Sequence, residues 1–123
     1  MTNEFDRANL HTAPHERVTA HGGDGQIEFC RLVESGALAG GVNFIDHAVL
    51  PPGVSIGRHR HAVDEEELYL VLSGEGVMWR DGAEFAVQRG DLVRNPPGGA
   101  HGLRNTGDGP LELFVIELTT TKP

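Results

Sequence analysis

The sequence predicts an all-β fold, a sandwich or barrel of short strands, and three observations support this prediction. Short apolar segments recur along the chain from residue 26 onward, separated by turn-forming residues. The 17 glycines and seven prolines are spread through the chain, which indicates many tight turns and no long helices. The 123 residues have the length of one ordinary domain, which can bury a core without disulfide bonds.

The first expected strands lie on either side of the turn Pro51-Pro52-Gly53. Before it, residues 26–33 and 42–50 carry the alternating pattern of half-buried strands. After it come residues 55–61 and then the apolar residues 67–72, which would return beside the preceding strand as a hairpin.

The remaining expected strands are separated by turns that contain glycine. Asp81-Gly82 is a strong hairpin sequence, and it joins residues 76–80 to residues 84–87. Two further turns, Arg89-Gly90-Asp91 and Gly107-Asp108-Gly109-Pro110, end neighbouring segments. The strands that remain are residues 92–94, 101–105 and 111–118.

Residues 1–25 are polar, and we expect them to form an arm and loop ahead of a barrel domain of residues 26–123. The arm contains His11, His15 and His21, which are irregularly spaced and lack a carboxylate partner. We therefore expect these histidines to be exposed to solvent. The glycine-rich residues 21–25 lack the lysine-serine pair of a phosphate-binding loop, so we expect a turn.

The charge and the apolar content exclude several classes of function. A net charge of -8, without a basic segment, makes nucleic acid an unlikely partner class. The first residues lack the apolar core of a secretory signal, and no apolar stretch could cross a bilayer, so we expect a cytoplasmic protein without membrane contact. Cys30 is the only cysteine, which excludes an intrachain disulfide and a thiolate cluster, and we expect it to be a small buried residue.

Three histidines and a glutamate have the spacing of a metal site built on antiparallel strands. His59 and His61 are two residues apart on an expected strand, so both side chains point to the same side of the sheet. Glu67 begins the next strand, and His101 follows the turn-forming residues Pro96–Gly99. The joint spacing of these residues predicts that they bind one metal ion.

The two stretches that carry these residues resemble the two conserved motifs of the cupin superfamily, and of its small bacterial single-domain members in particular. They read Gly53-x5-His59-x-His61-x5-Glu67-x6-Gly74 and Gly90-x5-Pro96-x-Gly98-x2-His101-x3-Asn105. The resemblance runs from about Phe44 to Leu118 and implies a double-stranded β-helix, a jelly-roll barrel, as one cupin domain. The metal motif is not repeated in the chain, so a single barrel is expected.

The first motif departs from the family pattern at its glutamate. The family usually has three or four residues between the second histidine and the glutamate, whereas Glu67 leaves five. Glu66 fits the distance from the histidines, and Glu67 fits the six-residue distance to Gly74. We prefer Glu67, because a loop absorbs an extra residue easily while a shift by one on a strand turns the side chain to the opposite face.

The donor set indicates a divalent transition metal, one ion per chain. Neutral imidazoles and a carboxylate suit Mn²⁺, Fe²⁺, Ni²⁺, Co²⁺, Cu²⁺ or Zn²⁺, and the sequence does not choose among them. Four protein ligands on a six-coordinate ion would leave two positions open for a substrate. We expect the walls of the substrate pocket to be mainly apolar. Tyr69 and Leu103 are assigned to it by strand alternation from Glu67 and His101, and aromatic character adds Phe44, Trp79 and Phe114.

Two functions are consistent with these residues. The first is a metal-dependent enzyme that acts on a small organic substrate, of the dioxygenase, decarboxylase, isomerase or cyclase type found among cupins. The second is a non-catalytic module that binds a metal and a small ligand such as a carboxylic acid. Several expected strands are apolar on both faces, so something must cover the outer face. We expect a second subunit in a homodimer, and the alternative is that the N-terminal arm covers this face within the monomer. We expect His47 to be a plain strand residue and Arg94 to be a surface residue.

Overall fold

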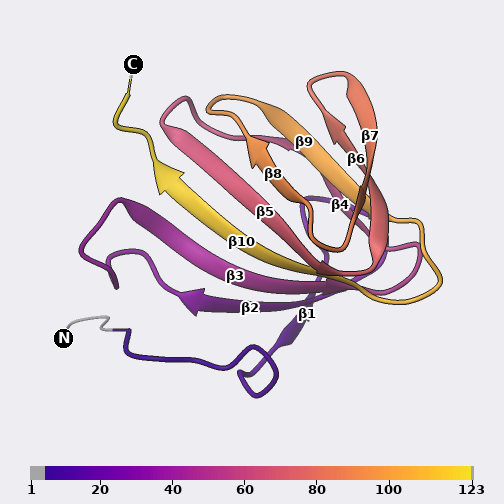
Figure 1. Cartoon of the computed structure of the whole chain (residues 1–123), viewed down its shortest axis with the longest axis horizontal. Helices are drawn as coiled ribbons and strands as arrows, with labels where there is room; N and C mark the ends of the chain where they lie inside the picture. The colour runs from indigo at the N-terminus through magenta and orange to yellow at the C-terminus, as the bar shows by residue number, and fades with distance from the viewer. Residues whose placement is uncertain (1–4, 123) are drawn as a thin grey trace.

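The computed structural model describes residues 5–122, which fold into two antiparallel sheets that face each other across a common core (Figure 1). The larger sheet has the strand order β1-β2-β3-β10-β5-β8, and the smaller has the order β4-β9-β6-β7. The strands of the larger sheet are β1 (Glu16–Val18), β2 (Ile27–Val33), β3 (Val42–Leu50), β10 (Leu111–Thr119), β5 (Glu65–Ser73) and β8 (Leu92–Asn95). Those of the smaller sheet are β4 (Ser55–Arg60), β9 (Ala100–Asn105), β6 (Glu75–Arg80) and β7 (Ala83–Gln88).

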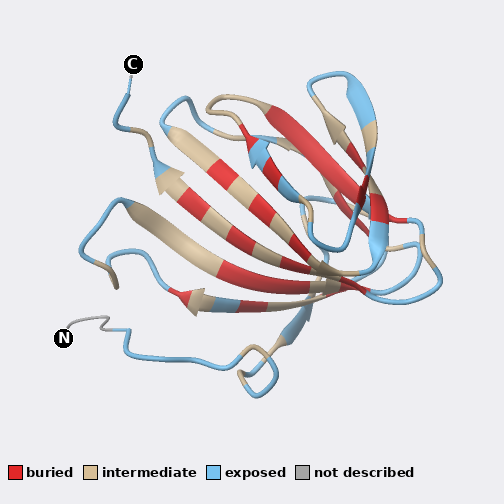
Figure 2. Ribbon diagram, viewed as in Figure 1, coloured by how far each residue is buried: buried red, intermediate tan, exposed pale blue. Residues whose placement is uncertain are grey.

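The core lies between the sheets because the strands alternate buried and less buried residues, as Figure 2 shows along β5 and β10. Tyr69 and Val71 of β5 point inward, as do Leu113 and Val115 of β10. Each fully buried apolar side chain of this size stabilises the folded state by about 1.5–3 kcal/mol. The same alternation leaves a second row of partly buried residues, such as Phe114, on the outer face of the larger sheet.

The prediction of an all-β jelly-roll barrel is confirmed, and each expected strand is present with its ends within two residues of the expected positions. The structure adds β1, which pairs with β2 at the edge of the larger sheet. Three residues are too few to display the two-residue periodicity of a strand, so the sequence pattern does not reveal β1. Residues 1–4 of the expected arm and Pro123 of the expected domain lie outside the described residues. In the part of the chain that the structure describes, no helix has the length and apolarity to span a membrane.

The hairpin predicted at Asp81-Gly82 joins β6 to β7. Asp81 and Gly82 have φ angles of 47° and 87°, and Arg80 pairs with Ala83 directly beside the turn. Positive φ at both central residues is the signature of a type I′ turn, which glycine tolerates and aspartate adopts more readily than most residues.

A loop of the N-terminal segment, residues 20–25, packs directly on β4. The backbone N–H of Gly57 donates to the carbonyl of Ala20 at 2.9 Å, and that of Ser55 donates to the carbonyl of Asp24 at 2.9 Å. A Cβ on Gly57 would overlap the carbonyl oxygen of His21, so the close approach requires glycine. His21 itself has a φ of 51°, a conformation that is uncommon for a residue other than glycine.

The preceding part of the segment is held to the outer face of β3. His15 Nε2 lies 2.7 Å from His47 Nδ1, and His47 Nε2 lies 2.7 Å from Glu112 Oε2 on β10. The expectation that His15 is exposed to solvent is therefore wrong, because His47 and the backbone of Ala13 engage both of its ring nitrogens. His47 is a buried strand residue, and its place on the outer face separates it from the core between the sheets.

Candidate metal centre

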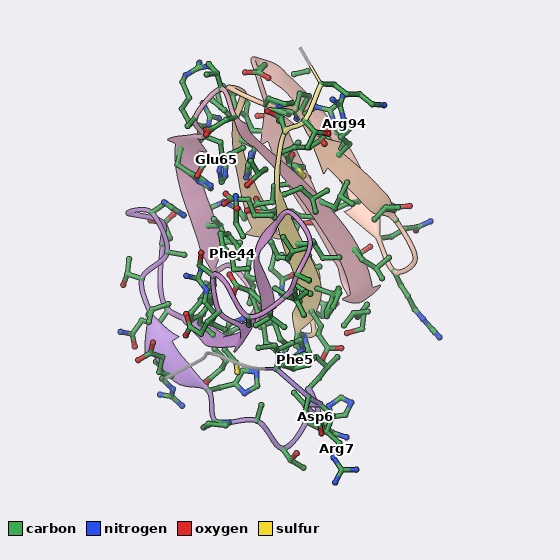
Figure 3. All side chains as sticks on the ribbon, turned by 90° about the vertical axis from the view of Figure 1, so that its left-hand side faces the viewer. Phe5, Asp6, Arg7, Phe44, Glu65 and Arg94 are labelled. Atoms are coloured by element: carbon green, nitrogen blue, oxygen red, sulfur yellow. The ribbon has the colours of Figure 1, made fainter. Side chains whose placement is uncertain are left out.

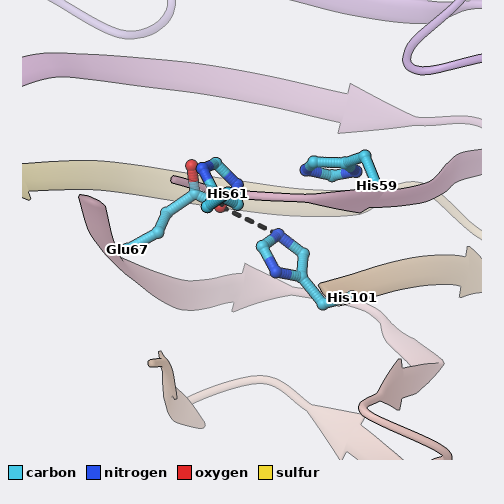
Figure 4. Close-up of side chains that lie close together, drawn as sticks. All are labelled: His59, His61, Glu67 and His101. Atoms are coloured by element: carbon cyan, nitrogen blue, oxygen red, sulfur yellow. Dashed lines mark ion pairs between the residues drawn. The ribbon is translucent and has the colours of Figure 1, made fainter. Parts of the chain in front are cut away.

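The fold brings His59, His61, Glu67 and His101 together inside the barrel (Figure 4). Each of the four offers one ligand atom, and these atoms all lie within 4.8 Å of one another. The donor set of three imidazole nitrogens and one carboxylate oxygen is a set that binds divalent transition metals. The group can therefore hold a metal ion.

Both sheets contribute to this cluster. His59 on β4 stands opposite His101 on β9 in the smaller sheet, and Glu67 reaches across from β5 in the larger sheet. His61 follows the last residue of β4, and its backbone N–H donates to the carbonyl of Gly99 at 3.0 Å. Two neighbouring strands and one facing strand thus fix the positions of the four side chains.

Two buried polar atoms in the cluster lack a hydrogen-bond partner, namely His61 Nε2 and Glu67 Oε1. Glu67 Oε1 lies 3.5 Å from His61 Nε2 and 3.0 Å from His101 Nε2. A buried polar atom without a partner costs about 1–3 kcal/mol. Coordination of a metal ion would satisfy both atoms, so the residues present fit such an ion.

His101 presents its Nε2 atom to the cluster, 3.0 Å from Glu67 Oε1. The Nδ1 of His59 lies 2.8 Å from the carbonyl oxygen of Gly57, which can only accept, so this nitrogen carries the proton and donates. The Nε2 lone pair of His59 is then free for a ligand. Tyr69 Oη lies 3.2 Å from His101 Nε2, and the tyrosine thus contacts the cluster from the core side.

The electrostatics favour deprotonated ligands at Glu67 and His59. Burial raises the pKa of Glu67, but the adjacent His101 and His61 side chains outweigh burial and lower the pKa to about 2. Burial lowers the pKa of His59 to about 4, because an imidazolium is poorly solvated there. Glu67 raises the pKa of His61 above its ordinary value. Metal ions bind carboxylates and neutral imidazoles. At neutral pH, Glu67 and His59 therefore already have the protonation states that coordination requires.

The lowered pKa of His59 predicts that this residue contributes a loss of stability to the metal-free protein as the pH falls from about 6.5 to about 4. In this range the unfolded chain binds a proton at His59, whose ordinary value is about 6.5, while the folded protein does not. This contribution lowers the free energy of unfolding as the pH falls, whereas the raised pKa values of His61, Asp46 and Glu117 act in the opposite direction. Urea unfolding of the wild-type chain and of His59→Gln at pH 7.0, 5.5 and 4.5 isolates the contribution of His59. His59→Gln should show a smaller fall than the wild-type chain, and equal falls in the two proteins would contradict the assignment.

The structure separates the two adjacent glutamates. Glu67 is 4% exposed and belongs to the cluster, whereas the carboxylate of Glu66 accepts a hydrogen bond from Arg94 Nε on the outer side of the sheet. In Figure 3, Arg94 lies well apart from Glu65 and Phe44, two residues that line the cavity beside the cluster. Arg94 is exposed, which agrees with the surface position expected for it.

A cavity of about 590 Å³ opens next to the cluster, and His59, His61 and Glu67 form part of its wall. Of the expected pocket residues, Phe44 and Tyr69 line this cavity. Leu103 lies in the buried core without lining it. Trp79 and Phe114 do not line it, because their neighbours Met78, Leu113 and Val115 take the inward positions of β6 and β10. Trp79 instead lies under the guanidinium of Arg58.

The N-terminal segment adds wall residues that sequence reasoning missed, and His21 is the nearest to the cluster. Its ring stacks on that of His59, with centroids 3.5 Å apart and an angle of 9° between the planes. His21 is exposed to solvent, as expected, but its contact with the cluster is not foreseen by the sequence. Its place depends on the packing of residues 20–25 on β4, and the glycines at positions 22 and 23 are the feature of the sequence that permits this packing.

A second missed group lies further along the same cavity. Arg31 donates from Nε and Nη2 to the two oxygens of Asp46, at 2.9 Å and 3.1 Å. The Arg31 guanidinium lies 4.1 Å from the ring centre of Phe44, within the range of a cation–π contact. Burial raises the pKa of Asp46, although Arg31 opposes this effect. Arg31 and Asp46 both line the cavity and give its wall a fixed polar region.

Comparisons with known proteins agree with this geometry. The family model described as "Cupin domain" matches residues 46–117. An oxalate-binding protein from Thermotoga maritima is 33% identical over 102 residues, which cover 82% of this chain and 84% of that protein.

Solved structures are similar over almost the whole chain. The crystal structure of a predicted oxalate decarboxylase from Thermotoga maritima has a TM-score of 0.88 at 29% identity, covering 94% of this chain and 100% of that one. The polyketide cyclase RemF from Streptomyces resistomycificus has a TM-score of 0.75 at 19% identity, covering 97% and 82% of the two chains. The second likeness is one of fold alone.

Proposed function

The chain belongs to the cupin domain family, and on this premise we propose that it is a metal-dependent enzyme that acts on a small organic substrate bearing a carboxylate. His59, His61, Glu67 and His101 would hold one divalent transition metal ion, and the cavity beside them would hold the substrate. The observation that carries the proposal is the pair of buried, unpartnered ligand atoms of His61 and Glu67 at the wall of a cavity large enough for a small molecule.

The charge of the cavity wall supports the proposal that an anionic substrate needs a bound metal ion in order to bind. The cavity wall has two arginines, Arg31 and Arg60, against five carboxylates, those of Glu16, Asp46, Glu65, Glu67 and Glu117. Without an ion this wall repels an anion, and a divalent cation offsets the excess negative charge. A carboxylate ligand would therefore bind to the metal-loaded protein and not to the metal-free one.

The residues of the chain have separate tasks in this proposal. A bound divalent ion would polarise an oxygen of the substrate or lower the pKa of a bound water. Phe44 and Tyr69 exclude water from the cavity wall, and Arg31 presents guanidinium N–H groups not used by Asp46. His21, stacked on His59, would contact the substrate beside the ligands. The name of the Thermotoga maritima relative supports oxalate as the first compound to test.

The experiment that tests the proposal combines metal analysis with calorimetry. Protein purified from its native host should contain about one equivalent of a transition metal per chain. Oxalate should bind to this protein, and binding should disappear after treatment with a chelator. Consumption of oxalate or of a related acid, followed with and without oxygen, separates catalysis from binding. Equal oxalate affinity of the metal-free and metal-loaded proteins would contradict the proposal.

We also expect a homodimer formed through the outer face of the larger sheet. The outward residues of β5 and β10 on this face are mostly apolar, including Leu68, Leu70, Phe114 and Ile116, and Leu92 of β8 is 65% exposed. A contiguous apolar patch of this kind is typical of an interface. Light scattering at micromolar concentration should give twice the mass of the 13.2 kDa chain. Leu70→Lys should shift the mass toward the monomer, and a monodisperse wild-type monomer would contradict the expectation.

A further inference from the structure

Glu117 stands directly behind the cluster, on the side of His61 that faces away from the other ligands. It lies on β10, where it pairs in register with Glu67 of β5, and it is 4% exposed. One of its oxygens, Oε1, lies 3.0 Å from His61 Nδ1. The opposite nitrogen of the same ring, Nε2, is the buried atom without a partner in the cluster.

Two further side chains fix the carboxylate of Glu117. Asn43 Nδ2 donates to Glu117 Oε2 at 3.0 Å, and Thr119 Oγ1 donates to Asn43 Oδ1 at 2.6 Å. The hydroxyl of Thr119 supplies the proton that orients the Asn43 amide, and the amide then turns its N–H₂ group toward Glu117. The carboxylate is thus held from behind, with its other oxygen directed at His61.

The carboxylate of Glu117 bears on where the proton of His61 lies. A carboxylate attracts an N–H group and repels a nitrogen lone pair, so the carboxylate oxygen 3.0 Å away favours a proton on His61 Nδ1. A neutral imidazole carries a single proton, which leaves a lone pair on Nε2. The lone pair is then directed into the cluster, as a metal ligand requires.

We propose that Glu117 is a positioning residue that holds His61 in the tautomer protonated at Nδ1 and directs its Nε2 at the metal. This inference rests on the proposed metal site, and it adds a second layer of side chains, from Thr119 through Asn43 and Glu117, that supports one ligand. Carboxylates that orient a ligating histidine typically contribute about 10–100-fold to metal affinity.

Glu65 is the natural control, because it is a second glutamate near the same nitrogen. Its Oε1 lies 3.6 Å from His61 Nδ1, beyond hydrogen-bond distance, and accepts a bond from the backbone N–H of Ala62 at 2.8 Å. Its side chain is also more exposed, at 35% against 6% for Glu117. Glu65 therefore offers the same chemical group at a similar distance without the fixed geometry.

The test compares Glu117→Met, Glu117→Gln and Glu65→Met. Methionine keeps the length of the side chain and removes both acceptors, so Glu117→Met should bind Zn²⁺ about 10–100-fold more weakly than the wild-type chain. Glu117→Gln keeps an oxygen for His61 if the Asn43 amide turns over, so most of the affinity should return. Glu65→Met should stay within about 3-fold of the wild-type chain.

A second readout does not depend on metal. Nitrogen-15 NMR of the metal-free protein, at a pH where His61 is neutral, distinguishes the two tautomers directly. The wild-type chain and Glu117→Gln should show the proton on Nδ1, and Glu117→Met should lose this preference. If the wild-type chain binds no metal, the proposed function fails while the tautomer still tests the role of Glu117. A wild-type proton on Nε2, or a tautomer unchanged in a folded Glu117→Met, would overturn the inference, as would an equal effect of Glu65→Met.

Discussion

Replacing His101 by alanine is expected to weaken metal binding by more than about 100-fold while the barrel remains folded. The loss should exceed the 10–100-fold typical of residues that only support a ligand, because one of four donors is removed. His101 is 1% exposed, and its Nε2 lies 3.0 Å from Glu67 Oε1, at the centre of the cluster. The fold should survive because an apolar core between two sheets holds it, unlike a zinc finger. Titration with Zn²⁺ and circular dichroism measure the two properties.

Matched controls separate the ligands from residues that merely lie nearby. His11→Ala changes an exposed histidine outside the cluster and should leave metal affinity unchanged. Glu67→Ala should behave as His101→Ala does, while Glu66→Ala should not, because Glu66 pairs with Arg94 on the outer side. Full metal occupancy in a folded His101→Ala protein would disprove the site, and a larger effect of Glu66→Ala would move the ligand by one residue.

Replacing Gly57 by alanine is expected to displace the loop of residues 20–25 and to destabilise the protein by about 1–3 kcal/mol, the usual cost of forcing extra volume into a packed site. The new methyl group would overlap the carbonyl oxygen of His21, which is backbone and cannot turn away as a side chain would. The loop would have to leave β4, and the stack of His21 on His59 would be lost with it. Urea unfolding measures the free energy, and the NMR signals of His21 report the stack.

Gly40→Ala is the control for this substitution. A methyl group at Gly40 would meet no atom within 4 Å, and Gly40 has no positive φ, so alanine there should change the free energy of unfolding by less than about 0.5 kcal/mol. A Gly57→Ala protein as stable as Gly40→Ala, with the His21 signals unchanged, would contradict the close packing of loop and strand.

The site residues that the sequence predicts correctly are those whose side-chain direction follows from their position along a strand. The spacing of His59 and His61 on one strand, and the choice of Glu67 by its distance to Gly74, depend only on local geometry, and the structure brings these residues together. Tyr69 was assigned by alternation from Glu67 and points inward. Trp79 and Phe114 were assigned by their aromatic character alone, without a neighbour of known direction, and both point elsewhere.

The residues that sequence reasoning missed depend on contacts between distant segments. His21 reaches the cluster only because residues 20–25 pack on β4, and nothing in its immediate sequence encodes that contact. The pair of Glu117 and His61 joins β10 of the larger sheet to the residue that follows β4 of the smaller sheet, so it depends on how the two sheets face each other. An acidic residue in an apolar strand, such as Glu117 between Ile116 and Leu118, is a pattern that identifies a buried carboxylate with a partner.

The position of β10 in the larger sheet has a consequence for how the chain reaches this structure. β10 is the last strand along the described chain, yet it lies at the centre of its sheet, between β3 and β5. Until β10 leaves the ribosome, β3 and β5 both present unpaired apolar edges, although the residues of the metal centre have already been synthesised. Folding then waits for pairings between distant parts of the chain, which makes it slow and exposes the nascent protein to aggregation. The four residues of the proposed metal centre can therefore come together only after synthesis of the barrel is essentially complete.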